Sequence, residues 1–330
     1  MMLEPPNFLS DDVIAARVDL VEEIRHELDQ TDQVHAMLNL ARAEARHRRI
    51  ERERFLKAHP RYDFLASPNP VVIVVGPRGV GKSHIIKTYQ EKFSMKEDWP
   101  AHARHVVNVE LSPDANKRQV QVDILTGFQD PDPQTGSDGK LRRRVRILSD
   151  QKETDLILVD EVQHFIASDG TTKRSSSVVD AFKKHVNSGV SAFGLFGTEA
   201  LDKIFSFGGS SGGEFGERGV ARFELTSLRD TAEHRQAYKN FLHTFRVGIE
   251  RLKILESAAI LEEDQTIGCL FEQAFRRYGT TQRLLKAAVR VALLRGGTAL
   301  LPRDFAMAVE LVKHLYGFRE NLFIAHAMAS

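Results

Sequence analysis

The sequence has little of several features that mark particular protein classes. It contains one cysteine, Cys269, which excludes an internal disulfide and fits a reducing compartment. Its 46 lysines and arginines nearly cancel its 45 aspartates and glutamates, so net charge favours no nucleic-acid partner and any basic surface must be local. No apolar run approaches the roughly 20 residues that span a bilayer, and residues 1–12 lack the basic and apolar regions of a signal peptide. We therefore expect a cytoplasmic protein without a membrane partner.

Length and composition indicate a globular chain of about two domains. The 330 residues are 42% hydrophobic and 28% charged, enough to fill and to cover a core, which excludes a disordered chain. From the patterns along the chain we expect a helical N-terminal arm (1–70), an α/β core (71–228), a smaller helical domain (229–315) and a C-terminal tail (316–330).

The α/β core is predicted from short apolar runs that mostly alternate with helical patterns. The run VVIVV at 71–75 is uninterrupted and β-branched, as in a strand buried on both faces of a parallel sheet. Further strands are expected at 105–109, 156–159, 192–196 and 221–225. The fold class is therefore α/β, a parallel five-stranded sheet flanked by helices. Beyond residue 225 the patterns are helical, near 231–252, 266–278, 281–294 and 302–315.

A complete phosphate-binding loop, GxxxxGK[ST], follows the first strand and precedes an amphipathic helix. Its glycines let backbone amides face phosphates without a Cβ in the way, and the helix end adds positive potential. Lys82 would reach the β- and γ-phosphates of ATP, and the Ser83 hydroxyl would ligate Mg²⁺. The residues expected to hold the nucleotide are Gly76, Pro77, Arg78, Gly79, Val80, Gly81, Lys82, Ser83 and His84.

The apolar strand expected at 156–159 ends in an acidic pair, Asp160 and Glu161. We expect Asp160 to hold Mg²⁺ through its water shell and Glu161 to orient and polarise the attacking water. A carboxylate beside the γ-phosphate must be ionised to do this, and the charge of the metal favours that state. The pair and the phosphate loop together predict ATP hydrolysis.

The segments GPRGVGKSHI, LILVDEVQHF and LFGTEAL together resemble the TniB/TnsC group of AAA+ transposition ATPases. DEVQHF and FGTEA carry most of this resemblance, because many P-loop proteins share the phosphate loop. The resemblance covers about 71–312 and implies an AAA+ P-loop core with a helical C-terminal domain. It also implies that Thr198 is the sensor-1 residue, which helps to position the hydrolytic water. A threonine that merely caps the following helix is the alternative.

The resemblance further implies an assembly with shared active sites. An arginine finger that reaches the neighbouring subunit's nucleotide would be Arg218 or Arg222, although either could be an ordinary ion-pairing arginine. Arg283 falls where AAA+ proteins often carry a sensor-2 arginine, and a helix-surface role is equally compatible. A finger supplied by a neighbour implies a ring or helical filament in which bound ATP holds the subunits together.

The run KLRRRVR at 140–146 is strongly basic, with five cations and no acidic residue. The resemblance implies that this part of the core tracks a DNA backbone. Phosphate contacts need cations but no base recognition, so binding to duplex DNA would be sequence-tolerant and salt-sensitive. A solvated helix face is the alternative. The expected DNA contacts are Lys117, Arg118, Lys140, Arg142, Arg143, Arg144 and Arg146.

The helical arm is also basic, with eight lysines and arginines against three glutamates between residues 41 and 61. The glutamates allow ordinary ion pairs along one helix. Packing of this stretch against a neighbouring subunit is therefore as compatible with the sequence as a DNA contact.

The leading interpretation is a regulator of DNA transposition. It would bind ATP and Mg²⁺, oligomerise on duplex DNA and recruit or activate a DDE-type transposase, with a target-selection protein as a further partner. ATP hydrolysis would then remodel or dissolve the assembly. One alternative is a helicase-loader or replication-initiator AAA+ ATPase. Another is a nucleotide-switched signalling or secretion scaffold that does not bind DNA.

Overall fold

The computed structural model of the chain describes residues 9–26, 29–62, 64, 67–94, 100, 102–113, 116–165, 180–201 and 221–329. The chain divides into two compact units. The first, here called the α/β unit, comprises residues 28–78 and 82–225. The second, here called the helical unit, comprises residues 1–27, 79–81 and 226–330. Residues 1–70, expected from the sequence as one arm, are thus shared between the two units.

The α/β unit contains a five-stranded parallel sheet in the order β2-β3-β4-β1-β5. Its strands are β1 (Val71–Val75), β2 (Val106–Glu110), β3 (Leu156–Asp160), β4 (Ala192–Gly197) and β5 (Ala221–Glu224). All five predicted strands are therefore confirmed, with ends that differ by about one residue. The run VVIVV lies between β4 and β5 and is buried at every position, as its β-branched composition predicts. Since all strands are parallel, their carboxyl ends lie along one edge, here called the carboxyl edge.

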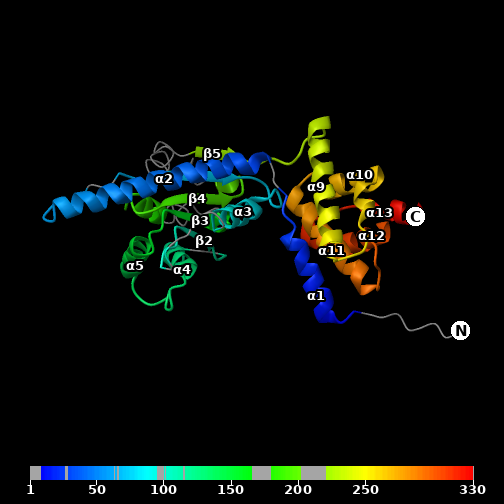
Figure 1. Cartoon of the computed structure of the whole chain (residues 1–330), viewed down its shortest axis with the longest axis horizontal. Helices are drawn as coiled ribbons and strands as arrows, with labels where there is room; N and C mark the ends of the chain where they lie inside the picture. Colours follow the sequence, from blue (N-terminus) through cyan, green and yellow to red (C-terminus); the bar gives the residue numbers. More distant parts are fainter. Residues whose placement is uncertain are drawn as a thin grey trace. The chain divides into compact units, whose positions relative to one another are not determined.

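Helices cover both faces of this sheet (Figure 1). Helix α2 (Asp29–Ala58) runs along one face, and α4 (Lys117–Gly127) and α5 (Asp138–Gln151) lie on the other. Helix α3 (Lys82–Ser94) directly follows the phosphate loop, and the short helix η2 (Val162–Phe165) follows β3. Residues 180–186 form a further helical stretch before β4. This is the predicted α/β architecture.

Helix α2 packs on the sheet through an apolar stripe with helical spacing. Val34, Leu38, Ala41 and Ala45 are all buried along it. The close approach requires a glycine in the sheet: a Cβ built on Gly194 of β4 would lie 2.9 Å from Leu38 Cδ2. The predicted arm helix is thus an integral layer of the α/β unit.

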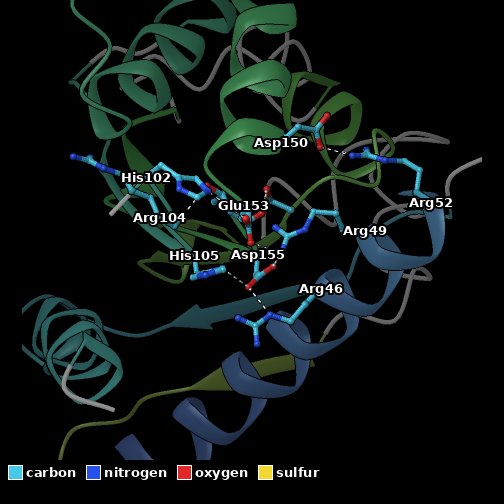
Figure 2. A network of polar contacts seen from close by, with 11 residues as sticks. Arg46, Arg49, Arg52, His102, Arg104, His105, Asp150, Glu153 and Asp155 are labelled. Atoms are coloured by element: carbon cyan, nitrogen blue, oxygen red, sulfur yellow. Dashed lines mark hydrogen bonds and ion pairs between the residues drawn. The ribbon is translucent and has the colours of Figure 1, made fainter. Parts of the chain in front are cut away.

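A second stripe on α2, made of arginines, pairs with acidic residues at the opposite end of the strands from the carboxyl edge (Figure 2). Asp155, which immediately precedes β3, is fully buried. Its carboxylate is 3.1 Å from Arg49 Nη2, 3.2 Å from Arg46 Nε and 3.1 Å from His105 Nδ1. Arg52, one turn further along α2, pairs with Asp150 at the end of α5.

Burial raises the pKa of Asp155 above its ordinary value, against the opposing effect of Arg49 and Arg46. Taking these charges out of water is therefore unfavourable, and their mutual attraction compensates for it only in part. The arginines of the 41–61 stretch are in large part internal: Arg42 stacks 3.5 Å above the Phe93 ring, and Arg46, Arg49 and Arg52 form ion pairs within the chain. These four side chains therefore have partners within the chain, which the sequence pattern alone did not indicate.

The helical unit has a core of its own. It is built from α9 (Ala232–Arg251), η3 (Ala259–Glu262), α10 (Asp264–Gln273), α11 (Tyr278–Leu294), α12 (Pro302–Tyr316) and α13 (Phe323–Ala329). Helix α1 (Asp11–Leu20), which is capped by Ser10, and η1 (Val21–Glu23) pack against these helices through Ile14, Val18 and Val21. In the predicted tail, Phe323 is fully buried and stacks 5.0 Å from Phe305. Within the described ranges, no helix is both long enough and apolar enough to cross a bilayer.

Candidate nucleotide site

The phosphate loop connects β1 to α3, between Val75 and Lys82. Gly79 and Gly81 have φ angles of +79° and +116°, a region that residues with a Cβ rarely adopt, so the glycines are needed for the shape of the loop. The Lys82 ammonium folds back over the loop and donates to the carbonyl oxygens of Gly76 at 2.8 Å and Pro77 at 3.0 Å. Lys82 is thereby buried beside two carbonyl oxygens at the beginning of α3, where a helix end and a positive charge together favour an anion.

Ser83 and Asp160 face each other at the carboxyl edge. The Ser83 hydroxyl donates to Asp160 Oδ2 at 2.6 Å, and the Glu161 backbone N–H donates to Asp160 Oδ1 at 2.8 Å. Burial raises the pKa of Asp160, and the hydrogen bonds from Ser83 and Glu161 oppose that shift. A hydroxyl beside a carboxylate at the end of a phosphate loop is an oxygen donor set that suits Mg²⁺ held together with nucleotide phosphates. The residues present therefore fit the predicted metal.

Glu161 directly follows the strand, and its backbone has a φ angle of +57°. This left-handed conformation is uncommon for a residue with a side chain and occurs often at functional sites. The Glu161 carboxylate accepts a hydrogen bond from Gln163 and lies 3.7 Å from His164 Nε2. The tight turn after β3 thus keeps both acidic residues at the carboxyl edge.

Thr198 follows the last residue of β4 and lies at the same edge. The Gly76 N–H donates to the Gly197 carbonyl at 3.1 Å, so the end of β4 borders the beginning of the phosphate loop. The structure therefore brings together five predicted site residues from three adjacent strands and their loops: Gly76, Ser83, Asp160, Glu161 and Thr198.

The predicted arginine finger and sensor 2 stay predictions. Arg218 lies outside the described residues. Arg222 is in the middle of β5, opposite Ile73, and its guanidinium is 3.4 Å from the Glu224 carboxylate. Arg283 is exposed on α11, with its guanidinium 6.0 Å from the centre of the Tyr316 ring.

Three of the seven predicted DNA contacts support the loop between α4 and α5. Lys117 pairs with Asp138 at 2.8 Å. Arg118 donates to the carbonyl oxygens of Gly136 and Gln134. Arg144 pairs with Asp130 at 2.8 Å and also donates to loop carbonyls. These side chains have a structural role that the sequence pattern did not indicate.

The other basic residues of α5 differ in exposure. Arg142 is half-buried. Burial lowers the pKa of His185 to about 4, and the nearby positive charge of Arg142 adds to that shift. Lys140, Arg143 and Arg146 are exposed and lie on one helical face at spacings of three. That face, here called the α5 basic face, is the part of the predicted DNA surface that the fold leaves accessible.

The strand order, the phosphate loop and the acidic pair are those of the AAA+ P-loop fold. A family model described as "AAA domain" matches residues 66–205. No curated protein matches the chain. Solved structures with a similar fold include ORC and Cdc6 proteins.

The ORC2 protein of Aeropyrum pernix, in ADPNP–ADP complexes, has a TM-score of 0.51 at 14% identity, with 82% of this chain and 67% of that chain covered. Cdc6p from Pyrobaculum aerophilum has a TM-score of 0.51 at 13% sequence identity, with 92% of this chain and 71% of that chain covered. The ORC1 protein of A. pernix in complex with DNA has a TM-score of 0.52 at 13% sequence identity, with 82% of this chain and 65% of that chain covered. At these identities the likeness concerns the fold, and it confirms the predicted AAA+ P-loop architecture with its helical N- and C-terminal parts.

Two residues with evident roles in the structure were not predicted from the sequence. Gln163 lies inside the DEVQHF motif, and its contact with Glu161 depends on the left-handed turn that the sequence does not reveal. Asp155 precedes a strand, a position that is usually solvated. The arginines at 42, 46 and 49 recur at helical spacing beside the apolar stripe of α2, and that signal could have indicated a buried acidic partner.

Proposed function

We propose that the chain binds ATP with Mg²⁺ and hydrolyses it. The observation that carries this proposal is the meeting of Ser83, Asp160 and Glu161 beside a phosphate loop whose lysine is already folded over it. Lys82 and the loop amides would hold the phosphates, and Ser83 and Asp160 would hold the metal. The metal supplies charge neutralisation to the phosphates when it is bound. Glu161 would orient and polarise the water, with Thr198 beside it.

Replacing Lys82 with alanine tests nucleotide binding. A hydrogen bond to a charged group contributes about 1.5–3 kcal/mol, so we expect ATP-analogue affinity to fall roughly 10- to 100-fold, as measured by calorimetry. Lys87→Ala is the matched control, because Lys87 is exposed on the same helix. Equal affinities of the two variants would remove the phosphate-loop assignment.

We further propose that the protein assembles on duplex DNA in its ATP state. The α5 basic face supports this part, since three exposed cations at helical spacing can follow phosphates without reading bases. The A. pernix ORC1 structure is itself a complex with DNA, which makes DNA a reasonable partner for this fold. An arginine finger from a neighbouring subunit, Arg218 or Arg222, and a ring or filament belong to the same proposal, as does a sensor-2 role for Arg283.

Replacing Lys140, Arg143 and Arg146 together with alanine tests the DNA surface. Each cation that no longer neutralises a phosphate should reduce the slope of log K against log salt by about 0.9, so a total reduction of up to about 2.7 is expected if all three engage. The measurement is binding to a duplex of unrelated sequence, with ATP analogue or ADP, across a salt series. Arg290, Arg303 and Arg319 replaced together remove the same charge from exposed positions in the helical unit and serve as the control. An unchanged slope would favour the scaffold alternative without DNA.

For the biological role we propose a transposition regulator of the TniB/TnsC type, on the strength of the DEVQHF and FGTEA segments. Its partners would be a DDE-type transposase and a target-selection protein. The second candidate is a replication initiator or helicase loader, which the fold likeness to ORC and Cdc6 proteins favours. The two candidates differ in the protein recruited by the ATP-bound assembly on DNA. Selective recruitment of a replicative helicase, with no transposase bound, would decide against transposition.

A further inference from the structure

Gln163 lies between the two residues that should handle the attacking water. Its side-chain amide nitrogen donates to Glu161 Oε2, and its carbonyl oxygen accepts the Thr198 backbone N–H at 3.1 Å. Only one orientation of the amide satisfies both neighbours. The reverse orientation would face an oxygen toward the carboxylate and an NH₂ group toward the N–H.

The end of β4 is shaped to receive this side chain. A Cβ built on Gly197 would lie 2.9 Å from the Gln163 carbonyl oxygen and 2.3 Å from Leu201 Cδ1, closer than packed atoms approach. Glycine at this position therefore lets the Gln163 amide lie against the end of the strand. The carbonyl of the same glycine accepts the Gly76 N–H at 3.1 Å, so the amide is anchored on the strand end that borders the phosphate loop.

Glu161 needs such an anchor. It occupies a left-handed turn after the sheet has ended, and its side chain is long and only half-buried. A carboxylate free to rotate there would spend much of its time away from the water it must polarise. Gln163 holds one of its oxygens, Oε2, and leaves Oε1 to accept from water.

We propose that Gln163 is a positioning residue for ATP hydrolysis. It fixes the Glu161 carboxylate relative to Thr198 and the phosphate loop, so that the water contacts of both residues are set by one amide. This inference rests on the proposed ATPase function. Gln163 acts only through Glu161 and touches neither nucleotide nor metal in this scheme.

Replacing Gln163 with methionine keeps the size of the side chain and removes both hydrogen bonds. Because small misplacements of a reacting group slow catalysis by up to about 100-fold, we expect kcat to fall roughly 10- to 100-fold. KM and ATP-analogue affinity should stay within about twofold, since the phosphate contacts are intact. Gln163→Glu, which keeps an acceptor for the Thr198 N–H but turns a second carboxylate toward Glu161, should lower kcat at least as much. Gln236→Met, at an exposed glutamine of α9, is the matched control.

A double-variant comparison separates positioning from a general structural role. If Gln163 acts through Glu161, adding Gln163→Met to Glu161→Gln should change kcat by less than about twofold. A further tenfold decrease in the double variant, a wild-type kcat in Gln163→Met, or a parallel decrease in ATP-analogue affinity would each overturn the inference. Those outcomes leave the ATPase proposal standing as long as the wild-type protein hydrolyses ATP and Glu161→Gln does not. A wild-type protein that binds but never hydrolyses ATP would overturn both proposals.

Discussion

Replacing Glu161 with glutamine should leave ATP binding intact and lower its turnover by about 100-fold or more. General-base and water-orienting groups contribute roughly 10²–10⁴ to rate, and a neutral amide retains the shape but not the basicity of the carboxylate. Phosphate release at saturating ATP with Mg²⁺ measures the effect, and analogue binding confirms that the nucleotide site is preserved.

Glu199→Gln is the matched control for this variant, because Glu199 is an exposed acidic residue at the same edge of the sheet. In the proposed mechanism, slow hydrolysis should also allow the ATP-bound assembly to accumulate, which sedimentation in the presence of duplex DNA would detect. Wild-type turnover in Glu161→Gln would exclude Glu161 from the catalytic role and leave the site as a nucleotide-binding switch.

The second large effect is expected on stability, at the buried carboxylate of Asp155. Asp155→Ala should lower the free energy of unfolding of the α/β unit by about 3 kcal/mol, because it leaves the buried Arg49 guanidinium without its closest partner. Glu153, 3.8 Å from Arg49, compensates only in part. Urea denaturation measures the free energy of unfolding, and hydrogen exchange of the amides in β3 and α2 shows whether the loss lies in the α/β unit.

Two comparisons sharpen this stability experiment. Glu44→Ala removes the partner of Arg48 in a partly exposed pair on the same helix and should cost at most about 0.5 kcal/mol. Asp155→Leu combined with Arg49→Met replaces the pair with apolar side chains and should recover most of the stability, because burial raises the pKa of Asp155 in spite of its arginine partners. If Asp155→Ala alone is as stable as the wild type, the ion pairs of α2 with Asp155 do not contribute to the stability of the α/β unit.

The sheet could be predicted from the sequence because its signal is local. An apolar β-branched run such as VVIVV has few alternatives to a buried strand, and parallel strands bring their loops to one edge. Gly76, Ser83, Asp160 and Glu161 are therefore predicted together from their positions in the sequence. Their mutual contacts follow from strand order, which places β4 between β1 and β3.

The remaining features depend on contacts between distant segments. Lys117, Arg118 and Arg144 were predicted as part of one DNA surface, yet they pair with groups at the beginning of α5 and in the α4–α5 loop once the two helices pack together. The role of Gln163 depends on a backbone angle at Glu161 and on the absence of a Cβ at Gly197. The backbone angle has no pattern in a single sequence, and the presence of Gly197 does not reveal which side chain packs against it. Charge runs in particular need the fold before they can be interpreted.

The seating of α2 on the sheet has a consequence for how this protein can be divided. The segment matched by the AAA family model, 66–205, leaves out both α2 and β5. Cut at those limits, a fragment would carry Gly194 and its apolar neighbours uncovered, with an edge of β1 left unpaired and Asp155 stripped of its guanidinium partners. Such a fragment would be prone to self-association. An autonomously folding ATPase module of this chain must therefore include α2, from residue 29, and β5, to residue 224.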